Sequence, residues 1–83
     1  MPKATFRKKV TIGAEQWFPN LDVEGVELVL ELNGAIFSVP TPIVRTLEGP
    51  VHIRPGYWIA TGSNGEHWPI DPEIFAKTYE KVE

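Results

Sequence analysis

The clearest structural signal in the chain lies in residues 57–70, which read Tyr57-Trp58-Ile59-Ala60-Thr61-Gly62-Ser63-Asn64-Gly65-Glu66-His67-Trp68-Pro69-Ile70. Two runs rich in aromatic and β-branched residues flank a polar segment, 62–65, that begins and ends with glycine. This arrangement is typical of a β-hairpin, because such residues favour strands and glycine allows the tight turn between them. The stretch therefore predicts two antiparallel strands joined by a short turn.

Upstream of this hairpin, further short segments carry strand patterns. Alternation predicts one strand that begins at Val10 and reaches toward Trp17. Segments 35–39, 43–47 and 51–54 are apolar and are bounded by glycine or proline, so each predicts a strand of its own. Pro55-Gly56 predicts a type II turn. Strands at this spacing favour a meander that curls upon itself.

The segment 22–32 supports two interpretations. Alternate positions are apolar, with Glu27 and Glu31 on the opposite side, which is a strand pattern. The same segment suits a helix, since Asp22 can cap its start, leucine and glutamate are good helix formers, and Asn33-Gly34 is a fitting stop. We predict a short helix over 22–32 and keep the strand as the alternative.

A second helix is predicted over 72–79. Asp71 is a good N-cap and Pro72 suits the first helical position, while Ile74, Phe75 and Tyr79 fall on one face. The predicted fold class is therefore α+β. It consists of a small, strongly curved antiparallel sheet, roll-like or barrel-like, of about five to six strands with two short helices. Residues 1–83 form a single domain.

Composition narrows the classes of protein. The 83 residues carry 8 Lys and Arg against 11 Asp and Glu, a net charge of −3, so duplex nucleic acid is not expected as a partner. The absence of cysteine excludes disulfide scaffolds and thiolate metal sites. No apolar run approaches the roughly 20 residues of a membrane-spanning helix, so no membrane association is expected. A chain this short buries limited surface, which favours a homo-oligomer.

Half of the basic residues lie in segment 1–9, namely Lys3, Arg7, Lys8 and Lys9. We interpret this segment as a basic N-terminal arm or as the approach to the first strand. A contact with an anion or with a partner protein is the functional alternative.

Several blocks of sequence together resemble a known family. They are Thr46-Leu47-Glu48-Gly49, Pro55-Gly56-Tyr57-Trp58-Ile59, Gly65-Glu66-His67-Trp68-Pro69-Ile70, Glu73-Ile74-Phe75 and Thr78-Tyr79-Glu80, preceded by Arg7-Lys8-Lys9 and Gln16-Trp17. This pattern resembles short phage and prophage proteins that carry a C-terminal PGDYG-like motif. Tyr57 stands where that family usually has Asp, and Pro50 also departs from its pattern. The resemblance implies a phage protein made in the host bacterial cytoplasm, and it implies no particular reaction.

Aromatic and cationic residues of the β segments are the candidates for binding. Indole rings can stack on a base, and guanidinium groups can bind phosphate oxygens through paired donors. We expect Trp58 and Trp68 to be near neighbours across the hairpin. The candidate ligand-binding residues are Arg45, Arg54, Trp58, His67 and Trp68. The structural alternative is that the tryptophans belong to the core, which a chain of this length needs.

Catalytic and metal-binding patterns are weak. The two histidines, His52 and His67, lack the local spacing of a metal site, and no nucleophile lies beside a base, so we predict neither an enzyme nor a cofactor. We interpret the chain as a non-enzymatic phage binding protein. One hypothesis is a counter-defence protein that sequesters a nucleotide immune signal of the host. The alternative is a protein-interaction module that inhibits or redirects a host protein.

Overall fold

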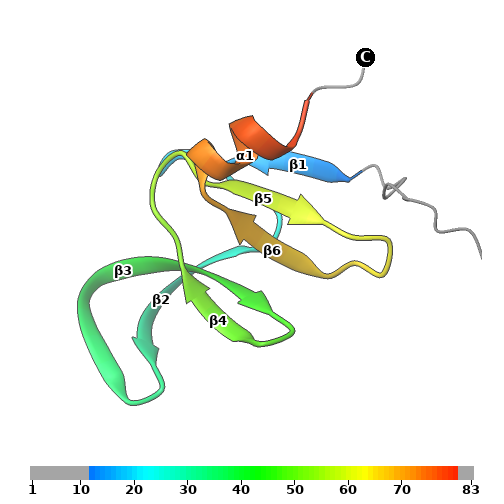
Figure 1. The fold of residues 1–83 in the computed structure, drawn as a ribbon. Helices are drawn as coiled ribbons and strands as arrows, with labels where there is room; N and C mark the ends of the chain where they lie inside the picture. Colours follow the sequence, from blue (N-terminus) through cyan, green and yellow to red (C-terminus); the bar gives the residue numbers. More distant parts are fainter. Residues whose placement is uncertain (1–11, 81–83) are drawn as a thin grey trace, which may run out of the picture.

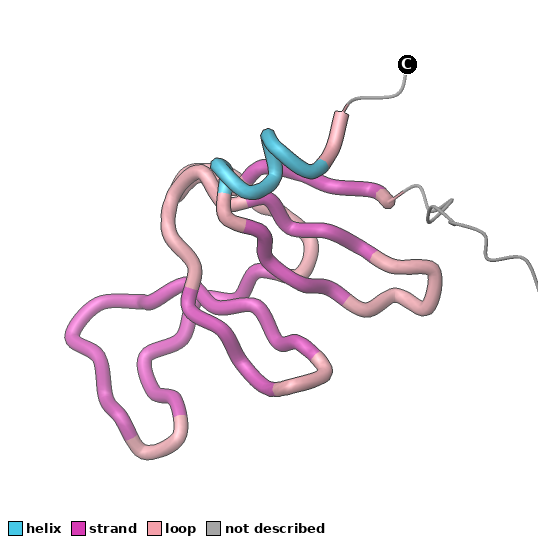
Figure 2. The backbone as a smooth tube through the Cα atoms, in the orientation of Figure 1, coloured by secondary structure: helices cyan, strands magenta, loops and turns pink. Residues whose placement is uncertain are grey.

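The structure of the chain is a computed structural model that describes residues 12–80. Within this range, six strands form two separate three-stranded antiparallel sheets, and one short helix follows the last strand (Figures 1 and 2). The predicted basic arm at 1–9 lies outside the described residues. The elements are β1 (Gly13–Gln16), β2 (Val26–Leu32), β3 (Ala35–Thr46), β4 (Gly49–His52), β5 (Trp58–Thr61), β6 (His67–Ile70) and α1 (Pro72–Thr78).

The first sheet has the strand order β1-β5-β6 and contains the predicted hairpin. β5 and β6 pair so that Ala60 lies opposite Trp68. The backbone N–H of Gly62 donates to the carbonyl of Glu66 at 2.8 Å, and Gly65 adopts φ +84°, so the turn forms where the glycines predicted it. β1 pairs with the other side of β5, which makes the hairpin part of a sheet.

The second sheet has the order β2-β3-β4, and it shows that the predicted helix over 22–32 is wrong. Residues 26–32 form β2, the strand alternative. Gly25 precedes it with φ +98°, a left-handed conformation that a right-handed helix excludes. Asn33 and Gly34 also have positive φ, 50° and 89°, as the mirror-image turn of a two-residue hairpin requires. The Asn-Gly pair therefore joins β2 to β3 and does not end a helix.

The prediction of two separate strands at 35–39 and 43–47 is wrong, because β3 runs continuously from Ala35 to Thr46 and residues 40–42 are extended within it. The pairing of β3 with β2 is irregular near Pro40 and Pro42. Two steps along β2, from Val29 to Glu31, match five steps along β3, from Thr41 to Ile36. This irregularity accommodates residues that lack an N–H donor within a curved strand.

The main core lies where the two sheets meet. Trp17, Val23, Val44, Ile53 and Ile59 form one buried cluster, to which both sheets and the loops between them contribute. β4 and β5 do not pair, although they are consecutive along the chain, and the connection between them passes from one sheet to the other. The prediction of one closed or roll-like sheet is therefore wrong, whereas the antiparallel strands and their approximate number are confirmed.

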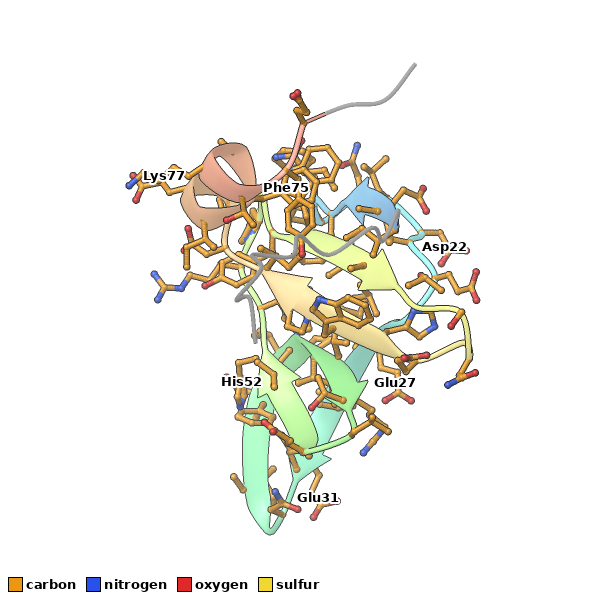
Figure 3. All side chains as sticks on the ribbon, turned by 45° about the vertical axis from the view of Figure 1, so that its right-hand side comes forward. Asp22, Glu27, Glu31, His52, Phe75 and Lys77 are labelled. Atoms are coloured by element: carbon orange, nitrogen blue, oxygen red, sulfur yellow. The ribbon has the colours of Figure 1, made fainter. Side chains whose placement is uncertain are left out.

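The predicted C-terminal helix is confirmed as α1, the one helix among the described residues. The side chain of Asp71 accepts a hydrogen bond from the N–H of Glu73 at 2.8 Å, and Pro72 occupies the first turn. Phe75 lies over the first sheet (Figure 3), where its ring stacks on Trp58 with centroids 4.3 Å apart. The helix thus covers the sheet face opposite the main core.

Candidate binding groove

A groove of about 420 Å³ lies between the β3–β4 hairpin and the edge strand β6. We call it the β6 groove. Its size falls within the range of sites that bind small molecules or short peptide segments. Its lining comes from the two sheets, with Thr46, Leu47, Glu48 and Val51 on one side and Glu66, His67, Trp68 and Pro69 on the other.

The β3–β4 turn forms the first wall and is held by one hydroxyl. Thr46 Oγ1 donates to the carbonyl of Gly49 at 2.7 Å and accepts from the N–H of Glu48 at 3.1 Å. These bonds fix the turn, because a side chain takes the role of a backbone turn partner. Leu47 at the tip is 90% exposed, and Glu48 is exposed beside it. The wall therefore presents an apolar and an acidic side chain from a defined turn.

Glu66 begins the second wall. Its carboxylate accepts a hydrogen bond from the N–H of Asn64 at 3.0 Å and packs against Gly62. A Cβ atom placed on Gly62 would come within 2.5 Å of that carboxylate. Glu66 is thus held by the β5–β6 turn while it lines the groove, so its negative charge has a defined position.

His67 connects the two sheets beneath the groove. Its ring Nδ1 lies 3.1 Å from Oγ1 of Thr61, and its Nε2 lies 3.7 Å from Oε2 of Glu24. The ring also packs on Gly25, where a Cβ atom would come within 2.8 Å of it. The side chain is 17% exposed. These contacts position His67 as a packed link between the sheets, with one side toward the groove.

Strand β6 borders the groove, and its free edge offers few backbone groups. Since Gly62 and Glu66 form a hydrogen-bonded pair, the alternation of an antiparallel ladder directs the backbone groups of His67 and Pro69 away from β5. Pro69 has no N–H, so an added strand would find one donor missing. The edge of β6 is therefore poorly suited to strand addition, and the β6 groove presents mainly side chains.

The charge of the groove is negative. Glu48 and Glu66 contribute two carboxylates, and no Lys or Arg lines it within the described part of the chain. Leu47, Val51, Trp68 and Pro69 supply apolar surface to the same groove. Such a surface matches a ligand that joins a cationic group to an apolar one, since an indole face and carboxylates both attract cations.

Of the five predicted site residues, the structure brings His67 and Trp68 to this groove. Trp58 lies on the same sheet face as Trp68 but two pairs further along the ladder, opposite Ile70. Its half-buried indole stacks nearly parallel on Phe75, whose ring in turn stacks on Tyr79 with centroids 5.0 Å apart. Trp58 therefore serves packing between α1 and the first sheet.

The two arginines lie elsewhere. Arg45 on β3 forms an ion pair with Glu27 on the neighbouring strand, and both side chains are more than half exposed. Arg54 is exposed in the connection between β4 and β5, where its carbonyl accepts from the N–H of Tyr57 at 3.2 Å. Neither is among the residues that line the β6 groove. The expected meeting of indole and guanidinium groups does not form at this groove.

Sequence reasoning about the site missed the residues of the opposite wall, Thr46, Leu47, Glu48 and Val51. The expected resemblance to phage proteins includes two blocks, Thr-Leu-Glu-Gly at 46–49 and Gly-Glu-His-Trp-Pro-Ile at 65–70, and residues of both blocks line the groove. Their grouping in one expected pattern was the one indication that three of these residues, Thr46, Leu47 and Glu48, lie near β6, and Val51 had no such signal.

Comparison with family models, with curated proteins and with solved structures found no match for this chain. Among residues 12–80, no group of three or more His, Asp or Glu side chains is placed to hold a metal ion. No helix in the same range is long and apolar enough to span a membrane.

Proposed function

We propose that this protein is a non-enzymatic binding module whose β6 groove takes a segment of another protein. The segment would carry a Lys or Arg beside an apolar side chain. The single observation that carries the proposal is the lining of the groove, to which Trp68 and Leu47 contribute together with the carboxylates of Glu48 and Glu66. The resemblance to phage proteins suggests the context, a host protein in the bacterial cytoplasm that is inhibited or redirected.

The charge of the lining favours a cationic partner over a nucleotide. A carboxylate about 6 Å from a phosphate charge costs about 1–3 kcal/mol at the effective dielectric constants of a protein surface. Glu48 and Glu66 would both impose this cost, and Arg45 and Arg54 do not line the groove to offset it. A basic side chain gains from the same two carboxylates. Sequestration of a nucleotide immune signal stays a prediction, and it enters the experiment as a competing outcome.

The edge of β6 supports binding by side chains. Because Pro69 interrupts the donors of the free edge, a partner gains little from extending the first sheet. A short segment would instead place its basic group near Glu48 and its apolar group against Trp68. Contacts of this kind give moderate affinity from a small area, as in transient complexes.

A random peptide library displayed on beads tests this proposal. Peptides that the full chain retains are sequenced, synthesised and measured by isothermal titration. We expect retained peptides to combine Lys or Arg with an apolar residue. Glu48→Gln should weaken their binding about fivefold to tenfold, because it removes one charge and keeps the shape. Glu73→Gln is the matched control, since this residue is also exposed and its change alters the net charge equally.

Two results would overturn the proposal. One is enrichment of acidic peptides, or of basic peptides whose binding Glu48→Gln leaves unchanged. The other is micromolar binding of cyclic dinucleotides or ADP-ribose in place of peptides, abolished by Trp68→Ala. That second result would favour the nucleotide hypothesis, because it would show an anionic ligand bound at a groove that carboxylates line.

A further inference from the structure

Strand β2 is an edge strand of the second sheet and carries exposed leucines. The order β2-β3-β4 leaves one side of β2 without a strand partner in the described structure. Its seven residues, Val-Glu-Leu-Val-Leu-Glu-Leu, include neither the proline nor the lysine that commonly protects an edge. Strands of this composition pair readily with another strand, because their residues have high β propensity.

The hydrogen bonds of β3 identify which backbone groups of β2 are free. The carbonyl of Pro42 accepts from the N–H of Ile53 at 3.2 Å, so the backbone groups of Pro42 face away from β2. Leu28 lies opposite Pro42, and its N–H and carbonyl therefore point away from β3. The pairing of β2 with β3 is regular from Val26 to Val29, so the edge offers a donor and an acceptor at Leu28.

The side chains of two leucines in β2, Leu28 and Leu30, extend the apolar surface beyond the core. Val26 on the same face packs against the buried cluster, whereas Leu28 is 61% and Leu30 is 55% exposed. A hollow of about 300 Å³ lies next to them and is lined in part by Leu21, Val26 and Leu28. An exposed apolar stripe and an apolar hollow therefore adjoin the same free edge.

The exposed area is suited to an interface between two chains. Leu21, Leu28 and Leu30, each 47–61% exposed, present on the order of 300 Å² of apolar surface along β2 and beside it. A stable interface takes about 800 Å² from each partner, of which a little over half is apolar. These three leucines supply more than half of the apolar area that one partner of a dimer needs.

We infer that β2 pairs antiparallel with β2 of a second copy of this chain, which joins the two second sheets into one. An antiparallel strand pair is self-complementary about a twofold axis, as a homodimer requires. A register centred on Val29 would set Glu27 opposite Glu31, which like charges disfavour. A register centred on Leu28 instead places Glu27 opposite Val29. It also brings a leucine of each copy next to the hollow of the other copy.

Sedimentation equilibrium of the full chain tests this inference. We expect a monomer–dimer equilibrium, with the dimer predominant at about 100 μM. Leu28→Lys should raise the dimer Kd at least about 100-fold, because both copies carry the substitution and each substitution weakens dimerisation about tenfold. Leu30→Lys should act in the same direction. Ile74→Lys on α1 is the matched control, since Ile74 is 58% exposed and lies outside the edge.

Hydrogen exchange adds a readout at the backbone itself. The amide proton of Leu28 should exchange slowly at millimolar concentration and faster on dilution or in Leu30→Lys. A monomer at 100 μM, or a dimer that both lysine variants leave intact, would overturn the inference. The β6 groove shares no lining residue with this edge, so peptide binding and dimerisation can fail independently.

Discussion

Replacing Gly25 with alanine tests the packing that joins the two sheets. Gly25 has φ +98°, and the left-handed region costs a residue with a Cβ atom about 1–2 kcal/mol. The added Cβ would also come within 2.8 Å of the His67 ring, which Thr61 holds from the other side. Displacing a packed ring costs a further 1–3 kcal/mol or so. We expect Gly25→Ala to lower the free energy of unfolding by about 2–5 kcal/mol.

Gly34→Ala is the matched control for the backbone part of this cost. Gly34 has φ +89°, but a Cβ atom there would meet no atom within 4 Å. We expect it to cost about 1–2 kcal/mol, which corresponds to roughly 4–16 °C in Tm for a domain of this size. The difference between Gly25→Ala and Gly34→Ala then measures the contact with His67.

Urea unfolding followed by tryptophan fluorescence gives these free energies, and a double-mutant cycle isolates the contact. In a His67→Ala background the ring is absent, so Gly25→Ala should cost only what Gly34→Ala costs. All samples need one protein concentration, because dimerisation would shift apparent stability. An equal cost of Gly25→Ala in both backgrounds would refute the packing of His67 on Gly25.

The remaining predictions concern single contacts. Asp71→Ala should destabilise the protein by about 1 kcal/mol in urea unfolding, since it removes the N-cap bond of α1; no change would contradict that role. Phe75→Leu should cost about 1 kcal/mol and reduce the near-ultraviolet circular dichroism, because the stack on Trp58 is lost; an unchanged aromatic spectrum would contradict the stack. Glu27→Gln should change the unfolding free energy by less than about 0.5 kcal/mol, because its ion pair with Arg45 is exposed; a larger loss would show that the pair is better shielded than described.

Local sequence patterns predicted the structure correctly where a short segment determines its own conformation. The β5–β6 hairpin, the turn at Gly56 with φ +97° and the start of α1 at Asp71 all form as predicted. In each case a glycine or a capping side chain satisfies a backbone requirement within a few residues. Such requirements can be read without knowledge of the rest of the chain.

The segment 22–32 shows where local reasoning was insufficient. Its leucines and glutamates suit a helix, but six of the seven residues of β2 pair with β3, which favours the strand. The helix prediction takes Asn33-Gly34 as a helix end, although Asn-Gly between two apolar runs is a strong hairpin signal. The tertiary partner, which lies beyond the segment, determined the outcome.

The division into two sheets and the composition of the β6 groove depend on contacts between distant residues. Thr46 and Trp68 are separated by the whole β4–β5 connection, and nothing in their local patterns indicates that they line one surface. The expectation that arginines would join the tryptophans followed from residue type alone. Arg45 instead lies beside Glu27, because the register of β2 on β3 places the two side chains on one face.

A crystal structure of the protein with a peptide retained from the library would test the proposed binding role most directly. We expect the peptide to lie between the β3–β4 turn and β6, with its basic side chain near Glu48 and its apolar side chain against Trp68. A peptide bound on another surface, or a β6 groove left empty beside a saturating peptide, would contradict the account.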